Sequence, residues 1–290
     1  MPQQPPPEWY DSMYNNRLLV PEFPQYVARW TEGSAQARRS RACHLDIPYG
    51  SGAREQLDIF PADAANAPVL FFIHGGYWRS LSRSDHSFVG AALARAGACV
   101  VLPSYDLCPG TAQQPVAIPR ITMQVVQALA WTWRNVARCG GDPQRITVAG
   151  HSAGGHLAAM MLACRWQDYA ADLPGDLVKN ALSISGLHEL ESIRRTPHLQ
   201  TSLRLTRADA TRASPAWMAA PGTGMLNAVV GADESAEFRR QNRLIQSSWG
   251  GSVVPLCEEL AGCNHFSVLE SLTTADSRLH GLALRLLGLA

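Results

Sequence analysis

The pentapeptide Gly-His-Ser-Ala-Gly at residues 150–154 has the residue types and spacing of an activated serine nucleophile. It follows the apolar run 145–149 and opens a segment rich in alanine, methionine and leucine, so we expect a strand to turn sharply into a helix here. Glycine at both ends suits such a turn, because a Cβ there would collide with the folded backbone that lifts the Ser152 hydroxyl above the sheet. The pattern predicts attack by Ser152 on a carbonyl carbon.

A second motif, His-Gly-Gly-Tyr-Trp at residues 74–78, follows the strand-like run 69–73. Its adjacent glycines leave backbone N–H groups free to point at a ligand. Attack on a carbonyl places negative charge on its oxygen, and each preorganised donor aimed at that oxygen is worth roughly 3–4 kcal/mol. We expect the N–H groups of Gly75, Gly76 and Ala153 to form this oxyanion hole. The alternative, a turn that only ends a strand, is weakened by the serine turn further along the chain.

A serine hydroxyl needs a general base, and the base needs a carboxylate that orients it. Asp233 follows a strand-like run in a loop where such strands deliver functional groups, and His265 follows the next strand-like run, before the last helix. We therefore predict Asp233 as the acid and His265 as the base for Ser152. Glu234 is the alternative acid, placed second because its longer side chain follows the same turn. The order of the three residues along the chain is that of an α/β-hydrolase.

The elements that would position these residues alternate between strands and helices. From residue 68 onward this alternation predicts an α/β fold with a mostly parallel, eight-stranded sheet and helices on both faces. The first two strands lack a helix between them, so they are expected to pair antiparallel at one edge. The predicted strands lie near residues 43–49, 54–60, 68–74, 98–102, 145–149, 180–185, 225–231 and 253–258. The predicted helices lie near residues 84–97, 117–138, 153–166, 235–249 and 270–287.

Two segments lie outside this scaffold within a chain predicted to be a single domain over residues 1–290. Residues 1–41 form a predicted N-terminal helical cap segment, which either contributes side chains to the pocket or simply packs against the sheet. Residues 187–222 form a lid-like insertion between two core strands, where a pocket wall is expected. The cap residues proposed for the pocket are Tyr14, Asn15 and Arg17. The apolar lining proposed for the lid is Leu187, Leu190, Leu199, Leu203 and Leu205.

Composition excludes several classes of partner and cofactor. A formal net charge of +1, with charges spread evenly, leaves no basic stripe for nucleic acid and no polybasic patch for a membrane. Seven cysteines without a C-x-x-C pair argue against a disulfide framework or a zinc site, and they suit a reducing cytoplasm. No cofactor or metal is expected, although Cys257, Cys263 and His265 are an alternative metal-ligating set. Residues 1–7 lack the features of a signal peptide, and a homodimer is left open.

Several motifs together resemble the kynurenine formamidase (arylformamidase) group of the α/β-hydrolases, which is close to the hormone-sensitive-lipase-like esterases. The resemblance implies Ser152 as the nucleophile, Asp233 and His265 as its partners, and an oxyanion hole at the glycine pair. We also expect His74, Tyr77 and Trp78 to contact the substrate. The matching motifs are H-G-G-Y-W at 74–78, S-Y-D-L-C-P at 104–109, G-H-S-A-G-G-H at 150–156, G-A-D-E-S at 231–235 and N-H-F at 264–266.

The resemblance implies a small-molecule acyl substrate, in which a small acyl group is bonded to an aromatic amine, as in N-formylkynurenine. The aromatic side chains near the predicted hole, with Trp217 as a further candidate, would stack on the flat leaving group. A substrate carboxylate would be bound by Arg17, by Arg79 or by the adjacent pair Arg194 and Arg195, among which the sequence does not choose. The alternative function is a carboxylesterase acting on short-chain or aryl esters. A non-catalytic binding protein is disfavoured, because all three triad residues are present.

Overall fold

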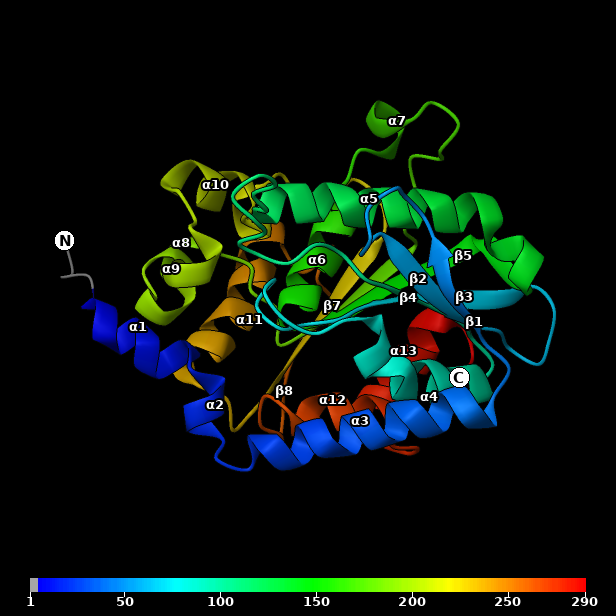
Figure 1. Cartoon of the computed structure of the whole chain (residues 1–290), viewed down its shortest axis with the longest axis horizontal. Helices are drawn as coiled ribbons and strands as arrows, with labels where there is room; N and C mark the ends of the chain where they lie inside the picture. Colours follow the sequence, from blue (N-terminus) through cyan, green and yellow to red (C-terminus); the bar gives the residue numbers. More distant parts are fainter. Residues whose placement is uncertain (1–4) are drawn as a thin grey trace.

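The computed structural model describes residues 5–290; residues 1–4, part of the stretch in which no signal peptide is predicted, lie outside the described residues. Eight strands form one sheet in the order β1-β2-β4-β3-β5-β6-β7-β8 (Figure 1). The strands are His44–Pro48 (β1), Gln56–Phe60 (β2), Ala67–Ile73 (β3), Cys99–Pro103 (β4), Gly141–His151 (β5), Asn180–Ile184 (β6), Met225–Gly231 (β7) and Leu256–Leu260 (β8). The predicted α/β fold is confirmed, with all eight strands at their expected positions.

The sheet is parallel from β4 to β8, and its other edge is antiparallel. Strand β2 pairs antiparallel with both β1 and β4. The β1–β2 pair is antiparallel because the short connection between these strands leaves no room for a crossover helix. The remaining pairs, from β3–β4 to β7–β8, are parallel. The carboxyl ends of β3, β5, β7 and β8 therefore meet at one edge of the sheet, where open α/β folds bind their ligands.

Helices cover both faces of the sheet because its central strands are apolar on both sides. Along β3, Val69, Phe71 and Ile73 face the core shared with α5 (Ile118–Asn135) and α6 (Ala153–Leu162). The alternate residues Leu70 and Phe72 face the opposite core. In Figure 1 α5, α6 and α11 cover one face, and α3, α4, α12 and α13 lie along the other. The helices named here for the first time are α3 (Phe23–Ser40), α4 (Ser87–Arg95), α11 (Ala236–Trp249), α12 (Ser267–Thr273) and α13 (Arg278–Leu287).

The last predicted helix, over residues 270–287, is two helices in the structure. The chain leaves the helical conformation after Thr273, and Asp276 has a φ of 64°. The Ser277 hydroxyl then accepts a hydrogen bond from the backbone N–H of His280. This contact caps the start of α13, because it satisfies one of the N–H groups that a helix leaves unpaired at its first turn. A side-chain cap thus restarts the helix after a break that periodicity alone does not reveal.

The N-terminal segment is helical, as predicted, and forms α1 (Pro7–Tyr14), α2 (Asn16–Leu19) and α3. Helix α3 buries Trp30, Ser34 and Ala37, whose spacing places them on one side of the helix, and it packs along α4. Helix α1 buries two tyrosines and contacts α9 (Pro197–Leu203) and α11. The segment therefore reaches from one helical layer to the other across the ligand-binding edge of the sheet (Figure 1).

The lid-like insertion contains several short helices. They are α8 (Glu191–Arg194), α9, α10 (Arg207–Arg212) and a 3₁₀ turn at Pro215–Trp217. The expectation that its leucines line the pocket is wrong. Each short helix turns its apolar side inward, so these side chains fill the hydrophobic core instead of facing a cavity. The buried side chains are Leu187, Leu190, Leu199, Leu203 and Leu205. Within residues 5–290, none of the helices has the length and apolar character needed to cross a membrane.

Candidate active site

Ser152 lies at the turn between β5 and α6 in a strained backbone conformation. Its φ is 58° and its ψ is −118°, a region that costs a residue with a Cβ on the order of 1–3 kcal/mol. Gly150 and Gly154 permit the turn. A Cβ at Gly150 would overlap the carbonyl oxygen of Gly154, and one at Gly154 would overlap that of Ile73. The predicted strand–turn–helix around Ser152 is confirmed, and it presents the hydroxyl at the edge where the parallel strands end.

His265 joins Ser152 to a carboxylate, and that carboxylate belongs to Glu234. The Nε2 atom of His265 is 3.2 Å from the Ser152 Oγ, and its Nδ1 atom is 2.6 Å from Glu234 Oε2. Both side chains of the His–Glu pair are buried, with the Glu234 side chain fully so. The three groups have the geometry of a nucleophile, a base and an orienting acid.

The prediction of Asp233 as the acid is therefore wrong, and the alternative, Glu234, occupies that position. The Asp233 N–H donates to the carbonyl oxygen of Cys263 (3.0 Å), which fixes its backbone beside the histidine loop while its side chain is exposed. Adjacent residues on a tight turn point in different directions, so the next residue faces inward. The extra methylene of glutamate then carries the carboxylate to the His265 ring.

The second oxygen of Glu234 is held by two further donors. Oε1 accepts hydrogen bonds from the Ser185 hydroxyl (2.5 Å) and from the Gly231 N–H (2.8 Å). Ser185 is fully buried at the end of β6, with a φ of 51°, and its own N–H donates to the carbonyl oxygen of Val229. Ser185 belongs to none of the motifs recognised in the sequence. The only signal for it was its place at the carboxyl end of a core strand.

We expect Ser185→Ala to lower kcat about 10- to 100-fold, because a hydrogen bond to a charged group contributes about 1.5–3 kcal/mol. Alanine keeps the Cβ at this positive φ, so the variant is expected to fold, with a melting temperature lowered by several degrees through the lost hydrogen bond, and KM is expected to change less than kcat. Steady-state kinetics with thermal unfolding measure all three. An unchanged kcat would show that the Gly231 N–H alone positions the carboxylate.

The glycine motif after β3 lies directly against the nucleophile. A Cβ on Gly75 would lie 3.2 Å from the Ser152 Cβ and 2.8 Å from the carbonyl oxygen of His151. The Tyr105 hydroxyl donates to the carbonyl oxygen of His74 (2.8 Å) and so holds the loop in place. Within residues 5–290, the backbone N–H groups of Gly75, Gly76 and Ala153 donate to no protein acceptor. These donors remain available to a ligand.

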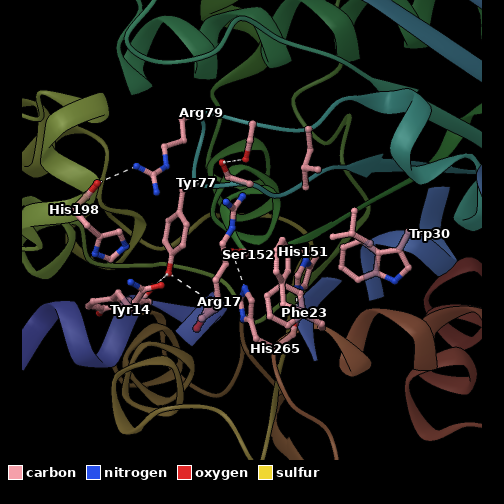
Figure 2. A pocket seen from close by; sticks show the side chains of 17 residues that line it. Tyr14, Arg17, Phe23, Trp30, Tyr77, Arg79, His151, Ser152, His198 and His265 are labelled. Carbon is pink, nitrogen blue, oxygen red and sulfur yellow. Dashed lines mark hydrogen bonds between the residues drawn. The ribbon is translucent and has the colours of Figure 1, made fainter. Parts of the chain in front are cut away.

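A cavity of about 180 Å³ opens beside Ser152 and His265. In Figure 2, Tyr77 and Arg79 lie on one side of Ser152, and Phe23 and Trp30 lie on the other. Seven of the 17 lining residues come from the N-terminal segment, and the remainder come mainly from the loop after β3 and from the two turns that carry Ser152 and His265. The lining residues are Tyr14, Asn15, Asn16, Arg17, Phe23, Val27, Trp30, Gly76, Tyr77, Arg79, Ser80, Leu81, His151, Ser152, His198, His265 and Phe266.

Of the three predicted substrate contacts, only Tyr77 lines this cavity. His74 is buried behind it and stacks on Tyr105, with ring centroids 4.2 Å apart. Trp78 is fully buried and meets His156 edge-on at 5.0 Å. The predictions for His74 and Trp78 are therefore wrong. Tyr77 and Trp78 both have positive φ, 50° and 53°, and this local fold sends the second ring into the core.

The cavity residues proposed from the N-terminal segment are confirmed, since Tyr14, Asn15 and Arg17 all line the wall. Tyr77 ties this segment to the glycine loop. Its hydroxyl donates to the carbonyl oxygen of Tyr14 (2.8 Å) and accepts from the Asn16 amide (3.3 Å). Burial, with the neighbouring Tyr14, raises the pKa of Tyr77 well above its usual value, so the phenol stays protonated and can donate.

Two guanidinium groups also border the cavity. No carboxylate lies within ion-pair distance of Arg17 or Arg79 in the part of the chain that the structure describes. Arg79 donates to the carbonyl oxygen of His198 (2.9 Å), and burial, together with the charge of Arg17, lowers its pKa. The other cationic candidates, Arg194 and Arg195, pair instead with Glu191. The cavity therefore carries positive charge that no protein carboxylate neutralises.

The remaining candidate for ring stacking, Trp217, lies elsewhere. It is 49% exposed and borders a separate surface pocket together with Trp9, Tyr10 and Leu244. His265 was also part of the alternative metal-ligating set with Cys257 and Cys263. Both of its ring nitrogens face protein groups, the Ser152 hydroxyl and the Glu234 carboxylate. The structure thus gathers the chemistry-bearing side chains around Ser152 and leaves Trp217 outside the site.

Comparison with known proteins gives the family. A model described as the alpha/beta hydrolase fold matches residues 70–248. The chain belongs to the α/β-hydrolase family, and it is a hydrolase. Two curated relatives match it over most of its length, which confirms the resemblance read from the motifs. Kynurenine formamidase of Salmo salar is 28% identical over 289 residues, covering 96% of this chain and 93% of the relative. The enzyme of the same name from Danio rerio is 27% identical over 271 residues, covering 91% and 88%.

A solved structure gives the same result for the fold. The crystal structure of a candidate thioesterase from Silicibacter sp. superposes with a TM-score of 0.81 at 28% sequence identity. The match covers 93% of this chain and 97% of the other. The similarity therefore extends well beyond the central sheet.

Proposed function

We propose that the protein is a serine hydrolase that removes a small acyl group from an aromatic amide, with an arylformamide of the N-formylkynurenine type as its substrate. The observation that carries this proposal is the buried Ser152–His265–Glu234 arrangement at the floor of a cavity bordered by aromatic and cationic side chains. The nearly full-length similarity to two kynurenine formamidases supports the choice of an arylformamide.

In the proposed mechanism, His265 takes the proton of Ser152 as the Oγ attacks the acyl carbon. Glu234 holds the His265 ring in the tautomer that leaves Nε2 free to accept this proton, and it stabilises the imidazolium that forms. The N–H groups of Gly75, Gly76 and Ala153 stabilise the oxyanion. His265 then gives the proton to the leaving amine, and water releases the acyl group from Ser152 by the same steps.

The lining of the cavity suits the two ends of such a substrate. Phe23, Trp30 and Phe266 offer apolar ring surface for a flat leaving group. Arg17 and Arg79, which lack a carboxylate partner within residues 5–290, suit a substrate that brings its own carboxylate. We further propose a reducing compartment, the cytoplasm, because all seven cysteines are free thiols.

The test compares kcat/KM for N-formylkynurenine with the values for p-nitrophenyl acetate and an aryl ester, with Ser152→Ala as the background. We expect kcat/KM for the formamide of about 10⁴ M⁻¹s⁻¹ or higher, the usual range for a physiological substrate. Rapid ester hydrolysis with negligible release of formate from N-formylkynurenine would reject the formamidase proposal. It would assign the same triad to a carboxylesterase.

A further inference from the structure

His151, the residue before the nucleophile, is 4% exposed, and one of its two ring nitrogens makes a hydrogen bond to the protein. Its Nε2 atom is 2.8 Å from the backbone carbonyl oxygen of His265. A carbonyl oxygen only accepts hydrogen bonds, so Nε2 must carry the hydrogen. Burial and the neighbouring His265 lower the pKa of His151 well below its usual value, which keeps the ring neutral. In a neutral ring with hydrogen on Nε2, Nδ1 is a hydrogen-bond acceptor.

This acceptor opens toward the substrate cavity. His151 lines the cavity, and its Nδ1 accepts no hydrogen bond from the described part of the chain. The unpartnered ring nitrogens of His74, His156 and His188 are fully buried, whereas His151 Nδ1 keeps some exposure. It faces the glycine loop, 3.4 Å from the point that a Cβ on Gly75 would occupy. A buried acceptor is thus presented beside the reacting serine.

The leaving group must pass close to the His151 ring. To receive its proton, the leaving nitrogen has to approach His265 Nε2, and the His151 ring is centred 4.7 Å from the His265 ring. The nitrogen lone pair must face His265, so the N–H of a secondary amide points in another direction. Beside the buried Ser152 and His265 side chains, an N–H that is left without an acceptor carries a desolvation penalty.

We propose that His151 Nδ1 accepts a hydrogen bond from the N–H of the scissile amide, which makes His151 a residue that determines preference for amides over esters. An ester oxygen has no hydrogen to donate, so an ester leaves this acceptor unpaired. The proton that completes departure of the amine still comes from His265. This inference rests on the proposed formamidase function and assigns one of its specificity contacts.

The experiment uses formanilide and phenyl formate, which share the formyl group and the phenyl ring. The two groups are joined by an N–H in formanilide and by an oxygen atom in phenyl formate. The readout is the ratio of kcat/KM for the amide to kcat/KM for the ester, measured by formate release with the spontaneous rate subtracted. We expect His151→Phe to lower this ratio about 10-fold or more, since a site that loses the partner of a substrate N–H discriminates against that substrate. Loss of the Nε2–H contact to His265 would slow both reactions alike and would leave the ratio unchanged.

Two further variants complete the test. His151→Gln can donate one amide hydrogen to the His265 carbonyl and present its oxygen to the cavity, so we expect it to keep most of the ratio. Val27→Ala alters the same cavity without removing an acceptor, so we expect it to change kcat/KM for the amide and for the ester by the same factor and to leave their ratio unchanged. An unchanged ratio in His151→Phe, with formanilide hydrolysed by the unmodified protein, would overturn this inference alone. Hydrolysis of phenyl formate without any hydrolysis of formanilide would overturn the proposed function together with it.

Discussion

Replacing Glu234 by glutamine is expected to lower kcat by about 10⁴-fold, the effect of a base held in the wrong tautomer. The matched change at the adjacent position, Asp233→Asn, is expected to leave kcat within about a factor of two, as for a surface substitution. The two variants each exchange one carboxylate for its amide, one residue apart on the same turn. Any difference between them therefore reports the position of the carboxylate and not the local charge.

The large effect at Glu234 follows from the contacts of both its oxygens. The Gly231 N–H donates to Oε1, so the glutamine oxygen must take this place. Its NH₂ group then faces His265 Nδ1, where the carboxylate oxygen now lies at 2.6 Å. Two donors cannot share that contact, so the ring adopts the tautomer with hydrogen on Nε2. In that tautomer Nε2 cannot accept the proton of Ser152.

Steady-state kinetics on N-formylkynurenine, with circular dichroism of each variant, measure this prediction. Glu234→Asp provides an intermediate point, because it keeps the charge but withdraws the carboxylate by one methylene. Equal activity of Glu234→Gln and the unmodified protein, with a large loss in Asp233→Asn, would restore Asp233 as the acid and contradict the geometry described above.

The nucleophile and the base were predictable because their signals are local. The turn at Ser152 needs glycine on both sides, and the five consecutive residues 150–154 show this pattern directly. His265 follows the last strand of the sheet, in a loop that holds no other histidine. The acid was not predictable in this way, because Asp233 and Glu234 occupy the same loop. Their roles depend on which of the two side chains points inward from the turn. The hydrogen bond from the Asp233 N–H to the carbonyl oxygen of Cys263 fixes the turn so that the Glu234 side chain is the one that does.

The fold was predictable from the apolar runs, whereas the cavity wall depended on packing between distant segments. A strand buried on both faces, such as β3, is recognisable from its sequence alone. Phe23 and Trp30 lie far from the triad along the chain, and they reach the cavity only because α3 packs along α4. Trp78 is the opposite case, a residue close to the site in sequence that does not reach the cavity. Its neighbours Tyr77 and Arg79 line the cavity, whereas its own ring is buried in the core.

Ser152→Ala is expected to show the largest loss of all, about 10⁵- to 10⁶-fold in kcat, because no other group can form the acyl intermediate. The variant should nevertheless fold normally. Alanine keeps the Cβ that the backbone already accommodates at a φ of 58°, and within residues 5–290 the hydroxyl makes a single hydrogen bond, with His265. The melting temperature is therefore expected to stay within a few degrees of the unmodified protein.

The same variant separates binding from chemistry. The cavity walls and the cationic pair at Arg17 and Arg79 do not depend on the Ser152 hydroxyl, so Ser152→Ala should still bind N-formylkynurenine with a dissociation constant close to that of the unmodified protein. Calorimetric titration of the inactive variant measures this constant without turnover. Retention of more than about one thousandth of the activity would exceed what an oxyanion hole and binding alone supply. It would mean that Ser152 is not the nucleophile, and the proposed mechanism would fail at its first step.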